Sequence, residues 1–150
     1  MNSNDIRAGL KKLLQNMNPV AAVYENNLPR GFVRPSYLIE TIRTRRTKAS
    51  AGLMSIAVDM SITCFAQVDA FGNSPQAALV TMQDDVMALF DSGYLPVGDR
   101  SPMVSASAAG INPGESYVDL TVQYSDEPKT KKEEYETMAD VAITTTIKED

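Results

Sequence analysis

The spacing of apolar residues along the chain predicts two helices. Over residues 4–17 apolar side chains return every three or four positions, so that they share one face of a helix. A side chain from Ser3 or Asn4 is expected to cap its start. The same spacing predicts a second helix over residues 74–91, capped by Ser74 or by the asparagine before it.

Alternation of apolar and polar residues predicts the strands. It is longest over residues 53–67, where the apolar side chains fall on one face. A strand over 36–43 completes a first β-hairpin with it. Residues 103–109 and 117–124 form a second predicted hairpin around an Asn-Pro-Gly turn. A shorter strand is expected at 20–25.

The order of these elements is helix, strand, long hairpin, helix, second hairpin and tail. It predicts an α+β fold in which a mostly antiparallel sheet carries two helices on one face. A chain of 150 residues is the usual size of one domain. We place this domain at residues 1–125 and interpret residues 126–150 as a charged linker followed by an arm or strand.

The composition argues against catalytic chemistry. The chain contains no histidine, so Ser-His-Asp, Cys-His and histidine-based metal arrangements cannot be built. The single cysteine, Cys64, lies on the apolar face of the predicted strand 53–67 and is expected to be a core residue. The glycines form no phosphate-binding motif. We therefore expect no enzyme, no cofactor and no metal site. No apolar stretch approaches the roughly 20 residues that span a membrane, so no membrane partner is expected.

The sharpest candidate site is the basic stretch between the arms of the long hairpin. The pattern places four cations on a loop there, at Arg43, Arg45, Arg46 and Lys48. Such cations can bind phosphates or an acidic partner surface, or they can keep the tip of a hairpin soluble. The net charge of the whole chain is −5, which argues against tight non-specific binding to duplex DNA.

The end of the chain is a second candidate contact segment. Residues 126–150 carry twice as many acidic as basic side chains. Met138 is followed by Val141, Ile143 and Ile147 at the spacing of a strand. A single apolar strand needs a sheet to join, so this segment is expected to add to its own sheet or to the edge of a neighbour's.

The order of several short sequence phrases resembles that of a known family. After the first helix come VYEN at residues 23–26 and the proline-led phrase PSYLIE at residues 35–40. The long hairpin then leads into a helix at residues 75–90. A strand at 118–124, a charged linker and a Met-containing tail at 138–147 close the chain. In this order the chain resembles the phage tail terminators, also called tail completion proteins.

The resemblance implies a structural virion protein, found in the phage tail and, during assembly, in the host cytoplasm. It implies a ring, expected to be a hexamer, that caps the head-proximal end of the tail tube and offers a docking surface to the head. The implied partners are further copies of the chain, the tail tube protein and the head–tail connector protein. DNA is expected to pass through the ring without sequence reading.

Two alternatives remain open from the residues. Another head–tail connector component, or a tube protein, would share this order of elements. A small nucleic-acid-binding protein would use the basic stretch, although the stretch lacks the interleaved aromatic residues on which bases stack.

Overall fold

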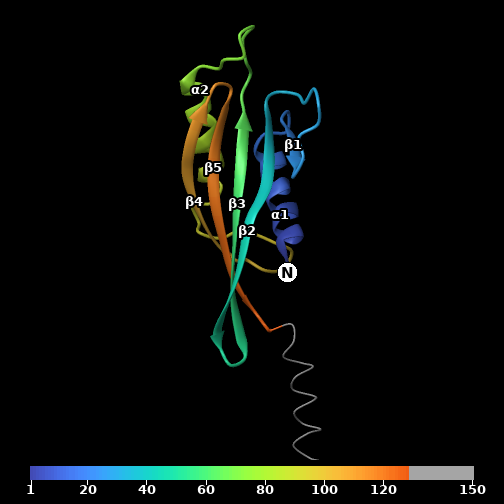
Figure 1. Ribbon diagram of the computed structural model, residues 1–150, viewed down its shortest axis with the longest axis vertical. Coiled ribbons are helices and arrows are strands. Elements are labelled where there is room, and N and C mark those ends of the chain that lie inside the picture. The colour runs from blue at the N-terminus through green and yellow to red at the C-terminus, as the bar shows by residue number, and fades with distance from the viewer. Residues whose placement is uncertain (129–150) are drawn as a thin grey trace, which may run out of the picture. The chain divides into compact units, whose positions relative to one another are not determined.

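The computed structural model of the chain describes residues 1–128 and confirms the α+β fold. Two helices accompany one mixed, mostly antiparallel sheet with the strand order β1-β2-β3-β5-β4 (Figure 1). The elements are α1 (Ser3–Met17), β1 (Ala22–Glu25), β2 (Ser36–Ser50), β3 (Leu53–Phe65), α2 (Gln76–Ala88), β4 (Met103–Asn112) and β5 (Glu115–Asp126).

Two tight turns and one parallel pairing set the connections of the sheet. Two-residue turns, Ala51-Gly52 and Pro113-Gly114, join β2 to β3 and β4 to β5. A connection this short joins antiparallel neighbours, so both pairs are hairpins as predicted. β1 instead runs parallel to β2, with Ala22 opposite Ser36. The sheet is therefore mixed but mostly antiparallel, with a parallel pairing at its β1 edge.

Backbone contacts divide the chain into two compact units. The larger unit contains residues 1–45 and 57–124, with both helices and most of the buried residues. Of the described residues, the smaller unit contains 46–56, which include the turn of the long hairpin, and 125–128. The predicted domain boundary at residue 125 stays a prediction, because residues 129–150 lie outside the described residues.

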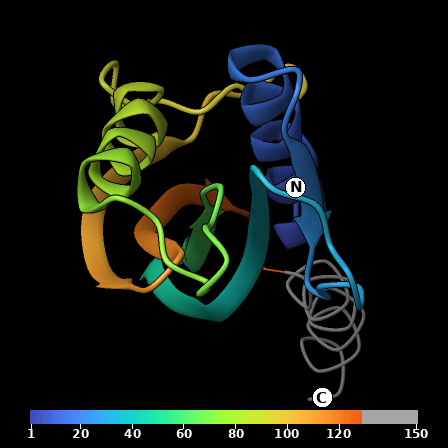
Figure 2. The same cartoon turned by 90° about the horizontal axis from the view of Figure 1, so that it is seen from above.

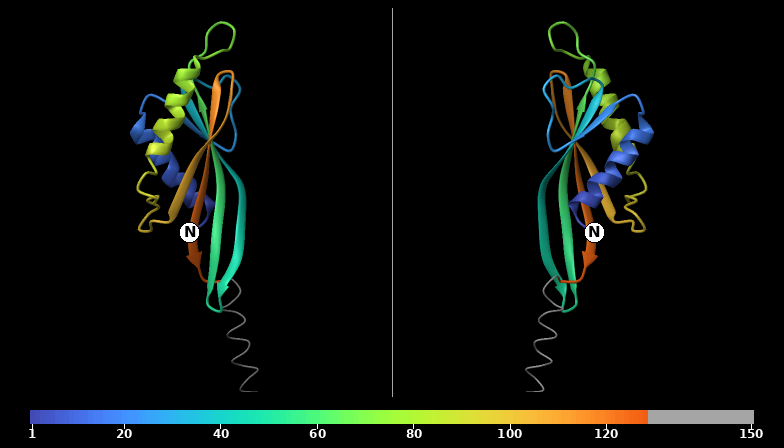
Figure 3. Two further views of the ribbon diagram at one scale, coloured as in Figure 1. Left: turned by 90° about the vertical axis from the view of Figure 1, so that its left-hand side faces the viewer. Right: turned by 90° about the vertical axis from the view of Figure 1, so that its right-hand side faces the viewer.

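The core of the larger unit lies between one face of the sheet and the two helices. Figures 2 and 3 show α1 and α2 on the same side of the sheet, α1 next to β1 and α2 next to β4. The alternation predicted for β3 and β5 is confirmed, because their apolar positions are buried against these helices. The innermost side chains include Ile6, Leu10, Leu14, Val58, Met60, Ile62, Cys64, Leu79, Val86, Val118, Leu120 and Val122.

The predicted cap of α1 is wrong by one residue. Asn2 occupies the cap, and its Oδ1 accepts hydrogen bonds from the backbone N–H groups of Asn4 (2.9 Å) and Asp5 (3.1 Å). The Asp5 carboxylate accepts in return from the Asn2 N–H at 2.9 Å. This reciprocal capping box satisfies donors that a helix start leaves unpaired.

The predicted cap of α2 is also wrong. α2 begins after Pro75, with no side-chain hydrogen bond at its cap, and is shorter than the predicted span. Ser74 Oγ instead donates to the carbonyl oxygen of Gln67 at 2.5 Å, and the Asn73 N–H donates to Asp69 Oδ1 at 3.0 Å. The Ser74 hydroxyl is therefore used inside the loop before the helix, and the Asn73 backbone belongs to the same loop.

A buried glutamine fastens α2 to the second hairpin. The register of β4 and β5 shifts between Ala108 and Ile111, where a β-bulge interrupts the ladder. Gln83 is 4% exposed, and its Nε2 donates to the carbonyl oxygens of Ala109 (3.2 Å) and Tyr117 (2.8 Å). The amide thus supplies hydrogen bonds where the bulge disturbs the strand pairing.

Candidate assembly surface

The four predicted contact cations lie in strand β2, so their placement on a loop is wrong. β2 continues to Ser50, and only Ala51 and Gly52 form the turn. Every residue of β2 after Thr41 is exposed. The strand persists there because β3 pairs with it across the turn, which residue types alone do not reveal.

One carboxylate holds two of the four cations. Arg43 donates from Nε (3.2 Å) and Nη2 (3.1 Å) to Oδ2 of Asp59, and Arg45 Nη2 donates to Oδ1 at 2.9 Å. Thr121 Oγ1, from β5, also donates to Oδ1 at 3.0 Å. All four residues belong to the larger unit. Asp59 on β3 is therefore the centre of a network that joins three neighbouring strands.

The network keeps Asp59 ionised. Burial acts first to raise the pKa of this carboxyl, because a charged group loses solvation. Hydrogen bonds from Thr121 and Arg43 and the positive charge of Arg45 outweigh this effect, and the pKa of Asp59 lies below its ordinary value. The carboxylate in turn offsets part of the positive charge of β2.

Arg46 and Lys48 are in a different position from Arg43 and Arg45. Both belong to the smaller unit, and both are exposed. Among residues 1–128 neither forms an ion pair with a carboxylate. The predicted cluster of four cations is thus divided into Arg43 and Arg45, which share the Asp59 carboxylate, and Arg46 and Lys48, whose charge is presented to the surroundings.

Both sides of the sheet offer unpaired strand edges. β1 pairs with β2 only from Ser36 to Ile39, and no other strand of the described chain pairs with that side of β2. β4 is the opposite edge strand, and within residues 1–128 the only strand-like pairing on its outer side is the bridge between Met103 and Tyr94. Such edges carry free backbone donors and acceptors that another strand can use.

Arg34 has a structural role that the sequence analysis missed. Its Nη1 donates to the carbonyl oxygens of Ala66 (2.9 Å) and Gly114 (2.8 Å). The guanidinium also lies over the rings of Phe32 (5.0 Å) and Phe65 (5.4 Å). Arg34 therefore connects the chain before β2 to the end of β3 and to the β4–β5 turn. No sequence signal indicates this, since Gly114 is 80 positions away.

Cys64 is a core residue, as predicted. Its side chain is fully buried, and burial raises the pKa of the thiol to about 12. A thiol with such a pKa carries almost no thiolate near neutral pH and is a poor nucleophile. Within residues 1–128 no three His, Cys, Asp or Glu side chains come together in a group that could hold a metal ion.

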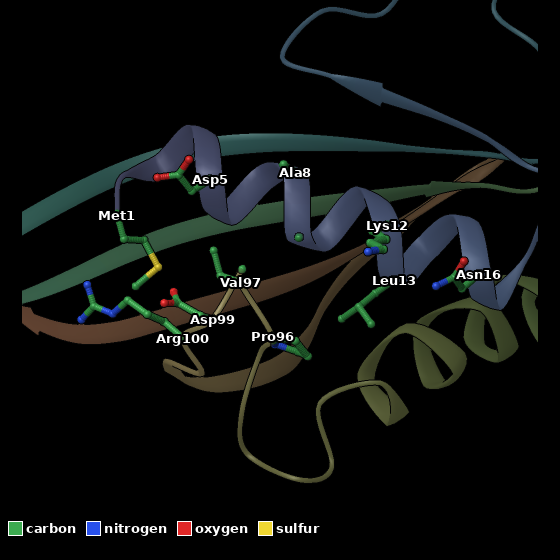
Figure 4. Close-up of a pocket in the computed structure, with 12 residues that line it drawn as sticks. Met1, Asp5, Ala8, Lys12, Leu13, Asn16, Pro96, Val97, Asp99 and Arg100 are labelled. Atoms are coloured by element: carbon green, nitrogen blue, oxygen red, sulfur yellow. The ribbon is translucent and has the colours of Figure 1, made fainter.

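A pocket of about 690 Å³ lies between α1 and the loop at residues 96–100 (Figure 4). Both walls belong to the larger unit, and their backbones come close together at Gly9. A Cβ atom there would lie 2.9 Å from the carbonyl oxygen of Pro96. No pattern of residues along the chain indicates this pocket. Its lining includes Ala8, Leu13, Pro96 and Val97 and the charged residues Asp5, Lys12, Asp99 and Arg100.

The second predicted contact segment lies outside the described residues. Met138, Val141, Ile143 and Ile147 all fall beyond residue 128, and their role as an arm stays a prediction. Of the helices in the described part of the chain, neither is long and apolar enough to cross a membrane. No protein-family model matches the chain, and a comparison with curated proteins finds no match either.

Proposed function

We propose that the chain is a structural protein of a phage tail, a tail terminator that forms a ring on the head-proximal end of the tail tube. The ring ends tube polymerisation and provides the surface to which the head docks. The observation that supports a ring best is the pair of unpaired strand edges on β2 and β4. The order of sequence phrases described above supports the tail terminator in particular.

The two edges suit a contact that closes on itself. They lie on opposite sides of the strand order, so the β4 edge of one copy can pair with the β2 edge of the next. A contact between two different surfaces is head-to-tail, and it gives a closed ring when the rotation between copies closes. β4 has ten residues, and β2 continues for eleven residues beyond Ile39, so the two free edges are of similar length.

The cations of β2 then have two roles. Arg43 and Arg45 are held by Asp59 and stiffen the strand next to the interface. Arg46 and Lys48 present their charge to a neighbouring copy, to the tube or to DNA inside the ring. Charge on an edge strand also disfavours pairing with unrelated strands, which fits an edge reserved for one partner.

Mass measurement in solution and negative-stain images with purified tube protein test the proposal. A terminator is expected to form a discrete ring-sized oligomer that sits on tube ends and stops their growth. A protein that extends tubes would instead be a tube protein. A monomer at every concentration, with tube protein present, would overturn the proposal.

The contribution of the free cations is tested by paired variants. Arg46→Ser and Lys48→Ser together are expected to leave folding unchanged and to reduce capping of tubes. Arg30→Ser is the control, because Arg30 is also exposed but lies outside β2. Normal capping by the double variant, or an equal loss in the control, would remove these two residues from the contact surface.

Nucleic-acid binding is the second candidate, and the exposure of Arg46 and Lys48 favours it. Each cation that neutralises a phosphate of duplex DNA contributes about −0.9 to the slope of log affinity against log salt. Two free cations therefore predict a slope of about −2, and four would give about −4. Submicromolar binding at physiological salt with a slope of about −2 or steeper would favour nucleic-acid binding as the function, over a ring through which DNA only passes.

A further inference from the structure

Phe71 is the most exposed large hydrophobic side chain of the described residues. It is 87% exposed and lies in the loop between β3 and α2. A loop tip of a monomer gains nothing from an aromatic side chain in water, whereas aromatic residues are enriched as anchors at the centres of interfaces. The exposure of Phe71 therefore indicates that this side chain contacts a partner surface.

The turn around Phe71 is already fixed. Asp69 Oδ1 accepts hydrogen bonds from the N–H groups of Phe71 (2.8 Å) and Asn73 (3.0 Å). The backbone closes the same turn, since the Asp69 N–H donates to the Asn73 carbonyl oxygen at 2.9 Å and the Gly72 N–H to that of Asp69 at 3.1 Å. A loop that is held before binding loses less conformational entropy when it binds.

The pocket between α1 and residues 96–100 offers a matching surface. Its apolar part is formed by Ala8 and Leu13 on α1 and by Pro96 and Val97 on the loop (Figure 4). Its volume of about 690 Å³ exceeds that of one aromatic side chain, so it has room for Phe71 and part of the turn that carries it.

One charge pair can form between the two surfaces, while the charged lining of the pocket as a whole is balanced, with Asp5 and Asp99 against Lys12 and Arg100. Asp69 lies two residues before Phe71, and Lys12 lines the pocket. Lys12 is exposed and has no ion-pair partner among residues 1–128. An incoming turn would bring the Asp69 carboxylate towards this ammonium group. Charge pairs of this kind at the rim of an interface favour one orientation of docking.

The loop cannot reach the pocket of its own chain. Within the larger unit, the loop after β3 lies beyond one end of the sheet, while the N-terminus of α1 and the loop before β4 lie towards the other end (Figures 1 and 3). We propose that Phe71 of one copy inserts into the pocket between α1 and residues 96–100 of a second copy. The contact joins two different surfaces and is a second interface in addition to the paired strand edges.

Photo-crosslinking tests the contact directly. A benzophenone analogue of phenylalanine at position 71 keeps an aromatic side chain there and is mixed with unmodified, isotope-labelled copies. We expect crosslinked peptides between the probe and residues 5–16 or 96–100 of the labelled copy. The same analogue at Val20, which is 84% exposed, is the control. The proposal would be overturned if the crosslinks mapped outside the pocket or formed equally from position 20. It would also be overturned if no crosslink formed between copies.

Sedimentation measurements on two variants complete the test. Phe71→Ser is expected to weaken self-association at least tenfold, whereas Val20→Ser leaves it unchanged. Since neither side chain is buried, both variants should fold normally, as circular dichroism would check. Equal affinities for the two variants would contradict the contact. The unmodified chain keeps the two failures distinguishable. If it caps tubes but position 71 does not crosslink to the pocket of a second copy, this inference alone fails. If it does not cap tubes although the crosslink forms, the proposed function alone fails.

Discussion

Replacing Arg34 by alanine is expected to be among the most destabilising single changes in this chain. The change removes the two hydrogen bonds to the carbonyl oxygens of Ala66 and Gly114. It also removes the guanidinium from the rings of Phe32 and Phe65. Three segments that are distant in sequence then lose the side chain that connects them.

The magnitude follows from these contacts. Hydrogen bonds from a charged donor contribute about 1.5–3 kcal/mol each, and partial exposure places these two near the lower limit. Each cation–π contact adds about 0.5–1 kcal/mol. The free energy of unfolding should therefore fall by about 4 kcal/mol, a large share of the roughly 5–15 kcal/mol typical of a folded domain. Arg34→Lys should lose about half as much, since an ammonium lacks the planar fork.

Urea denaturation followed by far-ultraviolet circular dichroism measures this effect. For a slope of about 2 kcal/mol per molar urea, the alanine variant should unfold at a concentration about 2 M lower than the parent chain. Arg30→Ala is the matched control, because Arg30 is exposed and makes no hydrogen bond or ion pair with another described residue; its effect should stay within about 0.5 kcal/mol.

Two results would refute the reasoning about Arg34. If the free energy of unfolding falls by less than about 1 kcal/mol in the alanine variant, the contacts of Arg34 stabilise the fold little more than hydrogen bonds to water would. A lysine variant as stable as the parent chain would mean that charge alone matters and that the fork geometry does not.

Three further variants or treatments test other parts of the structure. Asp59→Asn should cost about 1–2 kcal/mol at neutral pH. Because the pKa of Asp59 is lowered by folding, its contribution is present above the unfolded pKa near 3.8 and is lost as the pH falls through the folded pKa. In urea denaturation the difference from the parent chain should therefore shrink as the pH is lowered below about 3.8; a difference that stays the same at every pH would contradict this. Gly114→Ala should cost more than about 1 kcal/mol by the same measurement, since φ is +79° and a Cβ would lie 3.0 Å from Val68 Cγ1; an unchanged midpoint would contradict the close approach. Cys64 should react with a thiol reagent at about pH 8 only after denaturant is added, and rapid reaction of the native chain would contradict a thiol pKa of about 12.

The fold could be predicted where one face of an element is buried. The alternation in β3 and β5 and the helical spacing in α1 arise from burial on one side, and burial selects residue types. The second half of β2 has no buried face, so its residues show no alternation, and their pattern indicates a loop instead of the strand that is found. Pairing with a neighbouring strand stabilises it, and such pairing leaves no trace in a local pattern.

The candidate site could be predicted only in part. The four cations of β2 are visible in the sequence as a charged run. Which of them form ion pairs depends on Asp59, and the alternating pattern around Asp59 predicts a strand but not the partners of its carboxylate. The role of Arg34 depends on contacts with residues up to 80 positions away, and the pocket depends on how α1 meets the loop at 96–100. Side chains that act across the fold cannot be found from spacing along the chain.

The two-residue turn at Ala51-Gly52 has a consequence for how this sequence can evolve. Successive strand residues point to opposite faces, so inserting or deleting one residue in the turn would invert every later side chain relative to its neighbour strand. Arg43 and Arg45 would then lose Asp59, while substitutions within the turn itself would leave the pairing intact. Related chains should therefore vary freely in which residues form this turn and hardly at all in how many there are.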